Sequence, residues 1–146
     1  MIHGDTVRLL RECSAGITMG IDSIGDVMTS VTDGKLREVL TDSREKHRSL
    51  GLETDRLLDN YGDNEREPSI MAKGMSKLKS EFMLTVSGDN KDSTVADLIT
   101  DGCNMGVKSL SKYLNEYTAA DEKSKDIAKR LICVEEDLCR DVRHWL

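Results

Sequence analysis

The sequence is poor in the residues that β-sheet and membrane proteins need. Its 146 residues include a single proline, Pro68, and only 3% of them are aromatic. A β-sandwich or barrel would need more aromatic, β-branched and turn residues. No apolar run is long enough to cross a membrane. We therefore expect one all-helical domain over residues 1–146, with a core of aliphatic side chains.

An excess of positive charge is also lacking. The formal net charge is −6, and acidic and basic residues alternate along the chain. A surface for nucleic acid or for an anionic membrane would need a basic face. We therefore expect neither a nucleic-acid partner nor a membrane partner.

The first residues lack the basic and then apolar layout of an export signal. The four cysteines form no C-x-x-C pair and have no zinc-type spacing. They are Cys13, Cys103, Cys133 and Cys139. We expect a cytoplasmic protein with free thiols. Cys13 and Cys103 are interpreted as small core residues, and a redox pair across the bundle is the alternative.

Apolar residues recur at steps of three and four along four long segments, as they do on one face of an α-helix. These segments cover residues 5–31, 35–61, 93–117 and 124–146. A shorter amphipathic segment lies within residues 68–86. The pattern predicts two antiparallel helical hairpins joined by a long crossover that contains a short fifth helix. This all-α layout is that of a ferritin-like four-helix bundle.

The two halves of the chain share a short repeat. Residues 13–17 and 103–107, which are 90 positions apart, both fit the pattern C-x-x-G-[IV]. Leu40 and Leu131 match at 91 positions. Together with the two hairpins, the repeat indicates a pseudo-twofold arrangement.

The chain resembles the uncharacterised ferritin-like proteins of bacteria in three features. These are the helical layout, the paired Cys-x-x-Gly segments, and the stretch His47-x-x-Leu50-x-x-Glu53 that leads to Gly62. The resemblance covers Thr6 to Trp145. It implies a short helical bundle whose relatives include metal-binding proteins and oxidoreductases.

Di-iron members of the ferritin-like superfamily bind metal with a Glu from each of two helices and a Glu-x-x-His pair from each of the other two. The positions that we expect at mid-bundle hold Ile17, Arg44, His47, Val107, Glu135 and Leu138. Of these six, only His47 and Glu135 are residues that bind iron. We therefore predict no di-iron centre and no cofactor, so that the metal site of the family is degenerate here.

A shift of the register by one residue gives a fallback set of metal ligands. The fallback ligands are Glu45, His47, Glu135 and Glu136. This set places Glu45 off the apolar stripe of its helix and supplies no second histidine.

Arg44 and Glu135 match at an interval of 91 residues, so we expect them to meet at the bundle centre as a buried ion pair with His47 nearby. The alternative is that Arg44 reaches solvent and Glu135 is a surface acid beside Glu136. His47 itself is interpreted as a hydrogen-bonded core residue rather than a ligand or base.

Phosphate-loop, Ser-His-Asp and dinucleotide-binding patterns are absent from the sequence. Our first hypothesis for function is a non-catalytic structural or interaction module that forms a homodimer. The second is an iron- or manganese-binding ferritin-like oxidoreductase or storage protein. The third is a binder of a small ligand in the bundle centre, through the polar patch of Ser43, His47 and Thr54.

Overall fold

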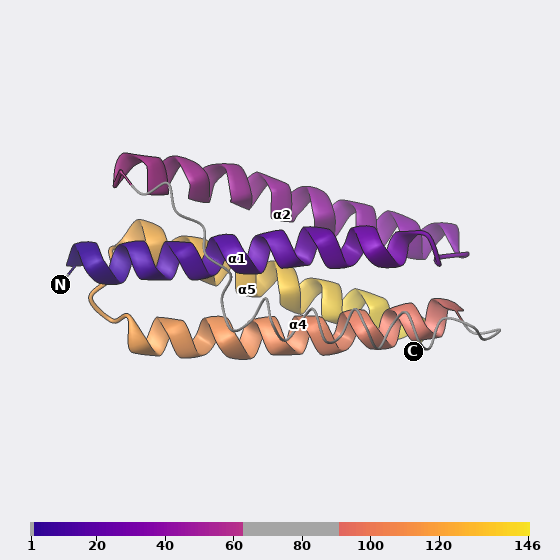
Figure 1. Cartoon of the computed structure of the whole chain (residues 1–146). Helices are drawn as coiled ribbons and strands as arrows, with labels where there is room; N and C mark the ends of the chain where they lie inside the picture. The colour runs from indigo at the N-terminus through magenta and orange to yellow at the C-terminus, as the bar shows by residue number, and fades with distance from the viewer. Residues whose placement is uncertain (1, 63–90) are drawn as a thin grey trace.

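The computed structural model describes residues 2–62 and 91–146, and every regular element in them is helical (Figure 1). The elements are α1 (Ile2–Met28), α2 (Gly34–Asn60), α4 (Lys91–Glu116), α5 (Glu122–Val142) and a 3₁₀ turn, η1 (Arg143–Trp145). The prediction of an all-α fold is confirmed. The short fifth helix predicted within residues 68–86 lies outside the described residues.

The four helices form two antiparallel hairpins, α1 with α2 and α4 with α5 (Figure 1). Helix α2 ends at the end of the bundle where α1 begins, and α4 begins at the opposite end. Helices α2 and α4 therefore run in the same direction, and the end of α2 and the start of α4 lie at opposite ends of the bundle. This confirms the predicted pair of hairpins with a crossover, and it excludes a simple up-down bundle.

The ends of the helices follow from local sequence. Asp33 caps α2, and its carboxylate accepts hydrogen bonds from the N–H groups of Lys35 and Leu36 at 2.7 and 3.4 Å. Asp121 caps α5 in the same way by accepting from the N–H of Ser124 at 2.8 Å. Helix α2 ends before Gly62, which adopts a left-handed backbone with φ of +72°.

The hairpins are tied together at both ends of the bundle by equivalent hydrogen bonds. At one end, the Asp92 carboxylate accepts from the N–H of Thr32 at 2.7 Å and of Asp33 at 3.0 Å. At the other, the hydroxyl of Thr6 accepts from the N–H of Asp121 at 2.8 Å. Thr6 and Asp92 are 86 residues apart, and Asp33 and Asp121 are 88 residues apart. Equivalent residues of α1 and α4 are therefore 86 positions apart, and equivalent residues of α2 and α5 are 88 positions apart.

Asp5, which we expected near the start of the first helix, lies within its first turn because α1 begins earlier, at Ile2. Its carboxylate accepts a hydrogen bond from the N–H of Ala119 at 3.0 Å, across the bundle. It therefore fixes the loop between α4 and α5 to α1.

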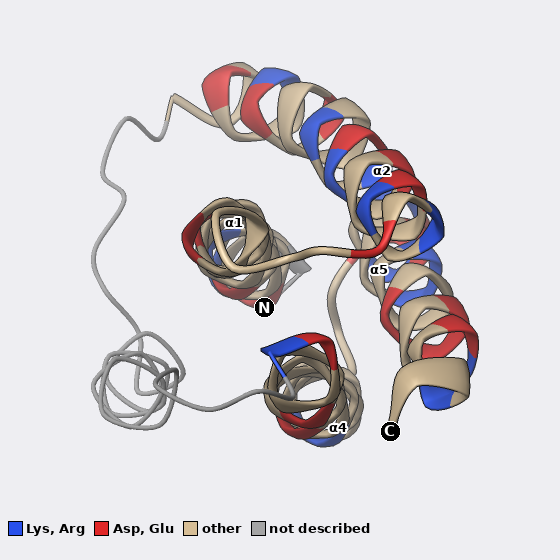
Figure 2. Ribbon diagram, turned by 90° about the vertical axis from the view of Figure 1, so that its right-hand side faces the viewer, with Lys and Arg blue, Asp and Glu red and all other residues tan. Residues whose placement is uncertain are grey.

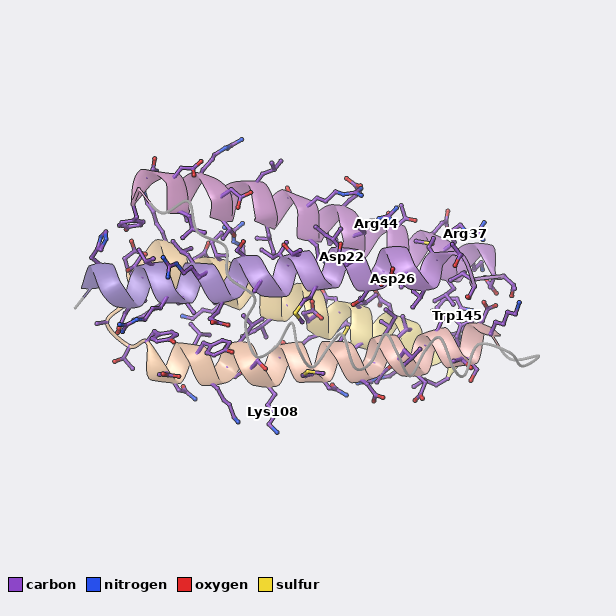
Figure 3. The ribbon with its side chains drawn as sticks, viewed as in Figure 1. Asp22, Asp26, Arg37, Arg44, Lys108 and Trp145 are labelled. Atoms are coloured by element: carbon purple, nitrogen blue, oxygen red, sulfur yellow. The ribbon has the colours of Figure 1, made fainter. Side chains whose placement is uncertain are left out.

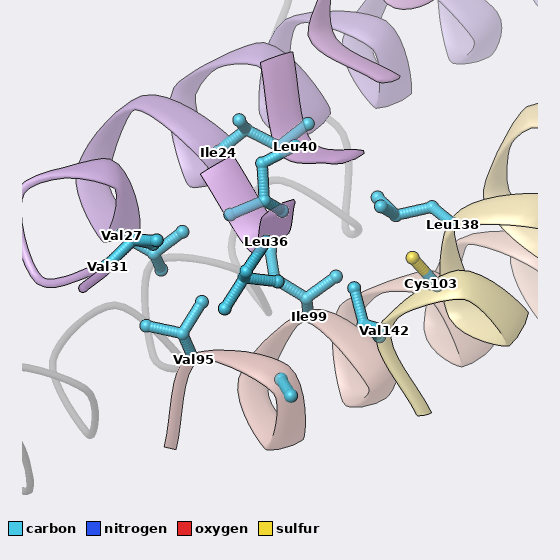
Figure 4. Close-up of a cluster of buried hydrophobic side chains, with 11 residues drawn as sticks. Ile24, Val27, Val31, Leu36, Leu40, Val95, Ile99, Cys103, Leu138 and Val142 are labelled. Carbon is cyan, nitrogen blue, oxygen red and sulfur yellow. The ribbon is translucent and has the colours of Figure 1, made fainter. Parts of the chain in front are cut away.

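Two clusters of buried apolar side chains fill the two ends of the bundle. The Leu36 cluster (Figure 4) comprises Ile24, Val27, Val31, Leu36, Leu40, Val95, Ala96, Ile99, Cys103, Leu138 and Val142. The Leu10 cluster comprises Leu9, Leu10, Cys13, Ile17, Leu50, Leu58, Leu110, Ala120, Ile127, Ala128 and Leu131. On α2 and α5, the residues between the two clusters are polar, and they form the bundle centre described below.

The outer surface carries charges of both signs. Figure 2 shows Lys and Arg interspersed with Asp and Glu along α2 and α5. None of the described helices is apolar over a length that would cross a membrane.

Candidate functional site

His47 lies in the middle of α2 and is held by its own helix. Its Nδ1 is 2.7 Å from the carbonyl oxygen of Ser43, one turn earlier. A carbonyl oxygen only accepts hydrogen bonds, so Nδ1 carries a proton and donates it. The other ring nitrogen, Nε2, therefore points away from α2 and toward the bundle centre.

At the centre, Nε2 of His47 lies 2.7 Å from Oε1 of Glu135 on α5. His47 is 0% exposed and Glu135 is 8% exposed. Burial alone would lower the pKa of His47, but the hydrogen bond and the negative charge of Glu135 raise it, and the net pKa is raised. The hydrogen bond to Glu135 and the charge of Glu135 thus favour the protonated form of His47, in which Nε2 donates to the carboxylate.

His47 and Glu135 are 88 residues apart, so they occupy equivalent positions on α2 and α5. Equivalent residues meet each other at a pseudo-twofold axis. Two carboxylates or two imidazolium ions at this point would repel. One of each attracts, and the pair thus joins the hairpins through the middle of the core.

Glycines of α1 and α4 lie directly beside this pair. A Cβ atom on Gly20 would be 2.5 Å from Nε2 of His47, which is too close for any side chain. A Cβ atom on Gly106 would be 3.5 Å from Oε2 of Glu135, an ordinary van der Waals contact. The imidazole therefore requires a glycine at position 20, whereas the carboxylate tolerates a larger residue at position 106.

A pocket with a volume of about 70 Å³ lies between α1 and α4, with the His47–Glu135 pair at its base. Its polar lining includes Ser23, Asp26 and Cys103, and the rest is mostly aliphatic. Four glycines also line it, two on each helix, namely Gly16, Gly20, Gly102 and Gly106. Mid-helix glycines thus leave the space that larger side chains would fill.

The thiol of Cys103 lines the same pocket. Burial, followed by the negative charge of Glu135, raises the pKa of this thiol. The thiol therefore stays protonated and is a poor nucleophile. Cys13 is buried in the Leu10 cluster and Cys103 in the Leu36 cluster, and both are free thiols.

The predicted pairing of Arg44 with Glu135 is not the pairing that the structure shows. The carboxylate of Glu135 bonds to His47, and Arg44 (Figure 3) lies against α1, where its Nη1 is 3.7 Å from the place of a Cβ on Gly25. The prediction used an interval of 91 residues between α2 and α5. The true interval of 88 residues makes His47 the equivalent of Glu135.

The repeat that we predicted from residues 13–17 and 103–107 was also aligned at the wrong interval, 90 residues instead of 86. At the interval of 86 residues, Gly16-Ile17-Thr18-Met19-Gly20 matches Gly102-Cys103-Asn104-Met105-Gly106. The buried central residue of α4 is thus Gly106, while Val107, which we placed at mid-bundle, is only half-buried. The position equivalent to Ile17 is Cys103.

Of the four fallback metal ligands, the structure brings together His47 and Glu135 but neither Glu45 nor Glu136. Glu45 is exposed and accepts a hydrogen bond from Arg48 at 2.6 Å on the outer face of α2. Glu136 is also exposed, whereas His47 and Glu135 are buried. Within residues 2–62 and 91–146, no three His, Cys, Asp or Glu side chains are grouped so that they could hold a metal ion.

Comparison with known proteins bears on the fold. No family model and no curated protein matches the chain. The helical bundle is similar to that of a DUF305 fragment. That structure, described as the crystal structure of a DUF305 fragment from Deinococcus radiodurans, has a TM-score of 0.77 over 96% of this chain and 93% of its own. At 11% identity, the similarity to the DUF305 fragment shows a common fold and does not extend to function.

Proposed function

We propose that this protein is a non-catalytic, ferritin-like helical bundle that binds a small molecule in the pocket at its centre. The observation that carries the proposal is the unfilled space beside the His47–Glu135 pair, bounded by glycines at equivalent positions of α1 and α4. Binding pockets are typically apolar cavities with a few well-placed polar groups. This pocket has that composition.

The pocket is maintained at a cost in stability. The side chains around a pocket of about 70 Å³ lose packing contacts that a filled core would give them. Each glycine inside a helix destabilises the fold by a further 0.5–1 kcal/mol or so relative to alanine. A bundle with a purely structural role would gain stability from a larger residue at position 106, where a Cβ atom makes only ordinary contacts. Retention of the space therefore supports a role in binding.

The ferritin-like assignment is supported by the two hairpins and the parallel α2 and α4. The competing hypothesis is an iron- or manganese-binding oxidoreductase or storage protein of the ferritin type. It requires near-stoichiometric metal in protein purified without added metal. The non-catalytic, metal-independent role requires well under one equivalent.

Ligand-detected NMR tests the proposed function. The full chain is screened against a mixture of acids, bases and neutral molecules of about three to five non-hydrogen atoms, sizes suited to this pocket. We expect at least one millimolar binder whose binding is lost in Gly106→Ala, because the added methyl group enters the pocket. The matched control is Gly4→Ala, since a Cβ on Gly4 meets nothing within 4 Å. The proposal fails if no compound binds, or if every binder is indifferent to Gly106→Ala.

We also propose a homodimer in the cytoplasm. Leu52 on α2, which is 63% exposed, is an apolar side chain that such an interface would cover. Sedimentation equilibrium of the purified chain tests the dimer, and a monomer at all concentrations would contradict it.

A further inference from the structure

We propose that the pocket selects a short alcohol, an uncharged molecule with one hydroxyl group and a small aliphatic part, over an amine, a carboxylate or a ketone of the same size. This inference rests on the proposed function, because it names the class of ligand for the same pocket. It follows from the balance of charge in the lining, from the hydrogen-bonding groups that the lining offers, and from the size of the pocket.

The pair at the base of the pocket has no net charge. Nδ1 of His47 donates to the carbonyl oxygen of Ser43, so this nitrogen holds a proton. Nε2 of His47 and Oε1 of Glu135 are 2.7 Å apart, and two lone pairs would repel each other at this distance, so one proton lies between them. With that proton on nitrogen, the pair is an imidazolium and a carboxylate. With the proton on oxygen, it is a neutral imidazole and a carboxylic acid, and the charges sum to zero in both forms.

The rest of the lining adds no unpaired charge that could select an ion. Asp26 on α1 is half-buried and is engaged in an interaction of its own. No Lys or Arg is among the described residues that line the pocket. An ion that enters the pocket loses part of its hydration, and only an opposite charge with good geometry offsets that loss. Neither an ammonium ion nor a carboxylate finds such a charge here, whereas an uncharged molecule has much less hydration to lose.

The polar groups of the lining suit a hydroxyl group. Oε2 of Glu135 lies beside Gly106, and both residues line the pocket. A carboxyl oxygen accepts hydrogen bonds, so a hydroxyl group at this place can donate one to it. The hydroxyl of Ser23 and the thiol of Cys103 also line the pocket, and either can donate to a ligand oxygen. A ketone could only accept, and it would cover Oε2 without giving it a donor.

The size and lining of the pocket limit the rest of the molecule. An apolar cavity of about 150 Å³ holds benzene. A pocket of about 70 Å³ therefore holds a molecule roughly half that size, which is about three or four non-hydrogen atoms. The side chains of Ile24, Leu110 and Leu138 form part of its apolar wall, so the carbon atoms of the alcohol would pack against aliphatic groups.

Probes of matched size and different chemistry test the inference on the full chain. These are 2-propanol, acetone, isopropylammonium chloride and sodium acetate, which all have the same number of non-hydrogen atoms in their organic part. Each is titrated at neutral pH while the amide signals of Gly20, Gly102 and Gly106 are followed by ¹H–¹⁵N NMR. We expect 2-propanol to shift these amides with a Kd of about 1–10 mM. The two ions should bind at least about tenfold more weakly because of their lost hydration. Acetone should bind at least about fivefold more weakly because it lacks a donor.

Matched variants locate the binding. Gly106→Ala should abolish the shifts that 2-propanol causes at Gly20 and Gly102, because the added methyl group enters the pocket beside Glu135. Gly4→Ala should leave the shifts unchanged, since a Cβ atom on Gly4 meets nothing within 4 Å.

A third variant tests the balance of charge. His47→Gln removes the group that compensates Glu135, so the ratio of the two affinities should move at least about tenfold from 2-propanol toward isopropylammonium. An unchanged ratio in a folded His47→Gln protein would overturn the inference. The ranking of the probes on the unmodified chain is measured independently of this variant, so the inference stays testable if His47→Gln does not fold.

The outcomes separate the two proposals. If an ion or acetone binds as tightly as 2-propanol and its binding is lost in Gly106→Ala, the ligand class is wrong and the proposed function stands. If 2-propanol binds equally well to Gly106→Ala, it binds elsewhere, and the inference is overturned. If neither these probes nor the fragment mixture shifts the pocket amides, both proposals fall.

Discussion

The two central glycines should respond in opposite directions to the same substitution. In Gly20→Ala, the new methyl carbon would lie 2.5 Å from Nε2 and 2.6 Å from Cδ2 of His47. The ring is fully buried and held by hydrogen bonds of 2.7 Å on both nitrogens. Relief of the clash therefore requires the ring to leave Glu135. Breaking a buried ion pair destabilises a protein by about 3–5 kcal/mol, and the helix preference of alanine offsets about 0.5–1 kcal/mol of that loss.

In Gly106→Ala, the methyl carbon would lie 3.5 Å or more from Glu135, in ordinary contact. No bond has to break, and the helix gains about 0.5–1 kcal/mol. Urea unfolding followed by circular dichroism measures both variants. We expect Gly20→Ala to lower the free energy of unfolding by about 2–4 kcal/mol and Gly106→Ala to raise it by up to about 1 kcal/mol. Equal effects of the two substitutions would refute the described contacts of the bundle centre.

Two further predictions concern the same pair, and a third concerns metal. The raised pKa of His47 means that the pair stabilises the fold fully below the unfolded pKa of about 6.5. The free energy of unfolding should therefore fall as the pH rises through the folded pKa, and His47→Gln should lose that component of the pH dependence. His47→Ala and Glu135→Ala should each lower the free energy of unfolding by about 3–5 kcal/mol. The double variant should lose clearly less than the sum of the two losses. If the two losses simply add, the side chains do not interact. Elemental analysis of protein purified without added metal should find well under one equivalent of iron, manganese or zinc, and a stoichiometric amount would favour the metal-binding hypothesis.

Much of the fold was predictable because helical periodicity is a local property. The stripes of three- and four-residue spacing predicted the four helices and their two hairpins. The end of α2 at Gly62 and its start at Asp33 were visible as turn and capping residues. The start of α1 was predicted too late, because the role of Asp5 depends on a bond to Ala119, which is distant in sequence.

The bundle centre was only partly predictable, because its partners are set by the axial register between helices. His47 and Glu135 both stood out as polar residues on apolar stripes, but the spacing within one helix does not show how far its neighbour is shifted. The interval of 91 residues, taken from Leu40 and Leu131, differs from the observed 88 by about one helical turn, so it gave Arg44 as the partner of Glu135.

A better signal for the register was present in the sequence. The five-residue match of Gly16–Gly20 with Gly102–Gly106, which includes a methionine at the fourth position of each, gives the interval of 86 residues. The pocket itself had no such signal. Its volume is what remains after side chains from four helices have packed, and no single segment of the sequence determines that remainder.

The most direct test of the binding site is a crystal structure of the full chain with a saturating concentration of a small molecule that binds in the NMR screen. We expect density for that molecule between α1 and α4, beside Gly106, with the His47–Glu135 bond intact. A pocket filled by the protein's own side chains, with no space beside Glu135, would contradict it.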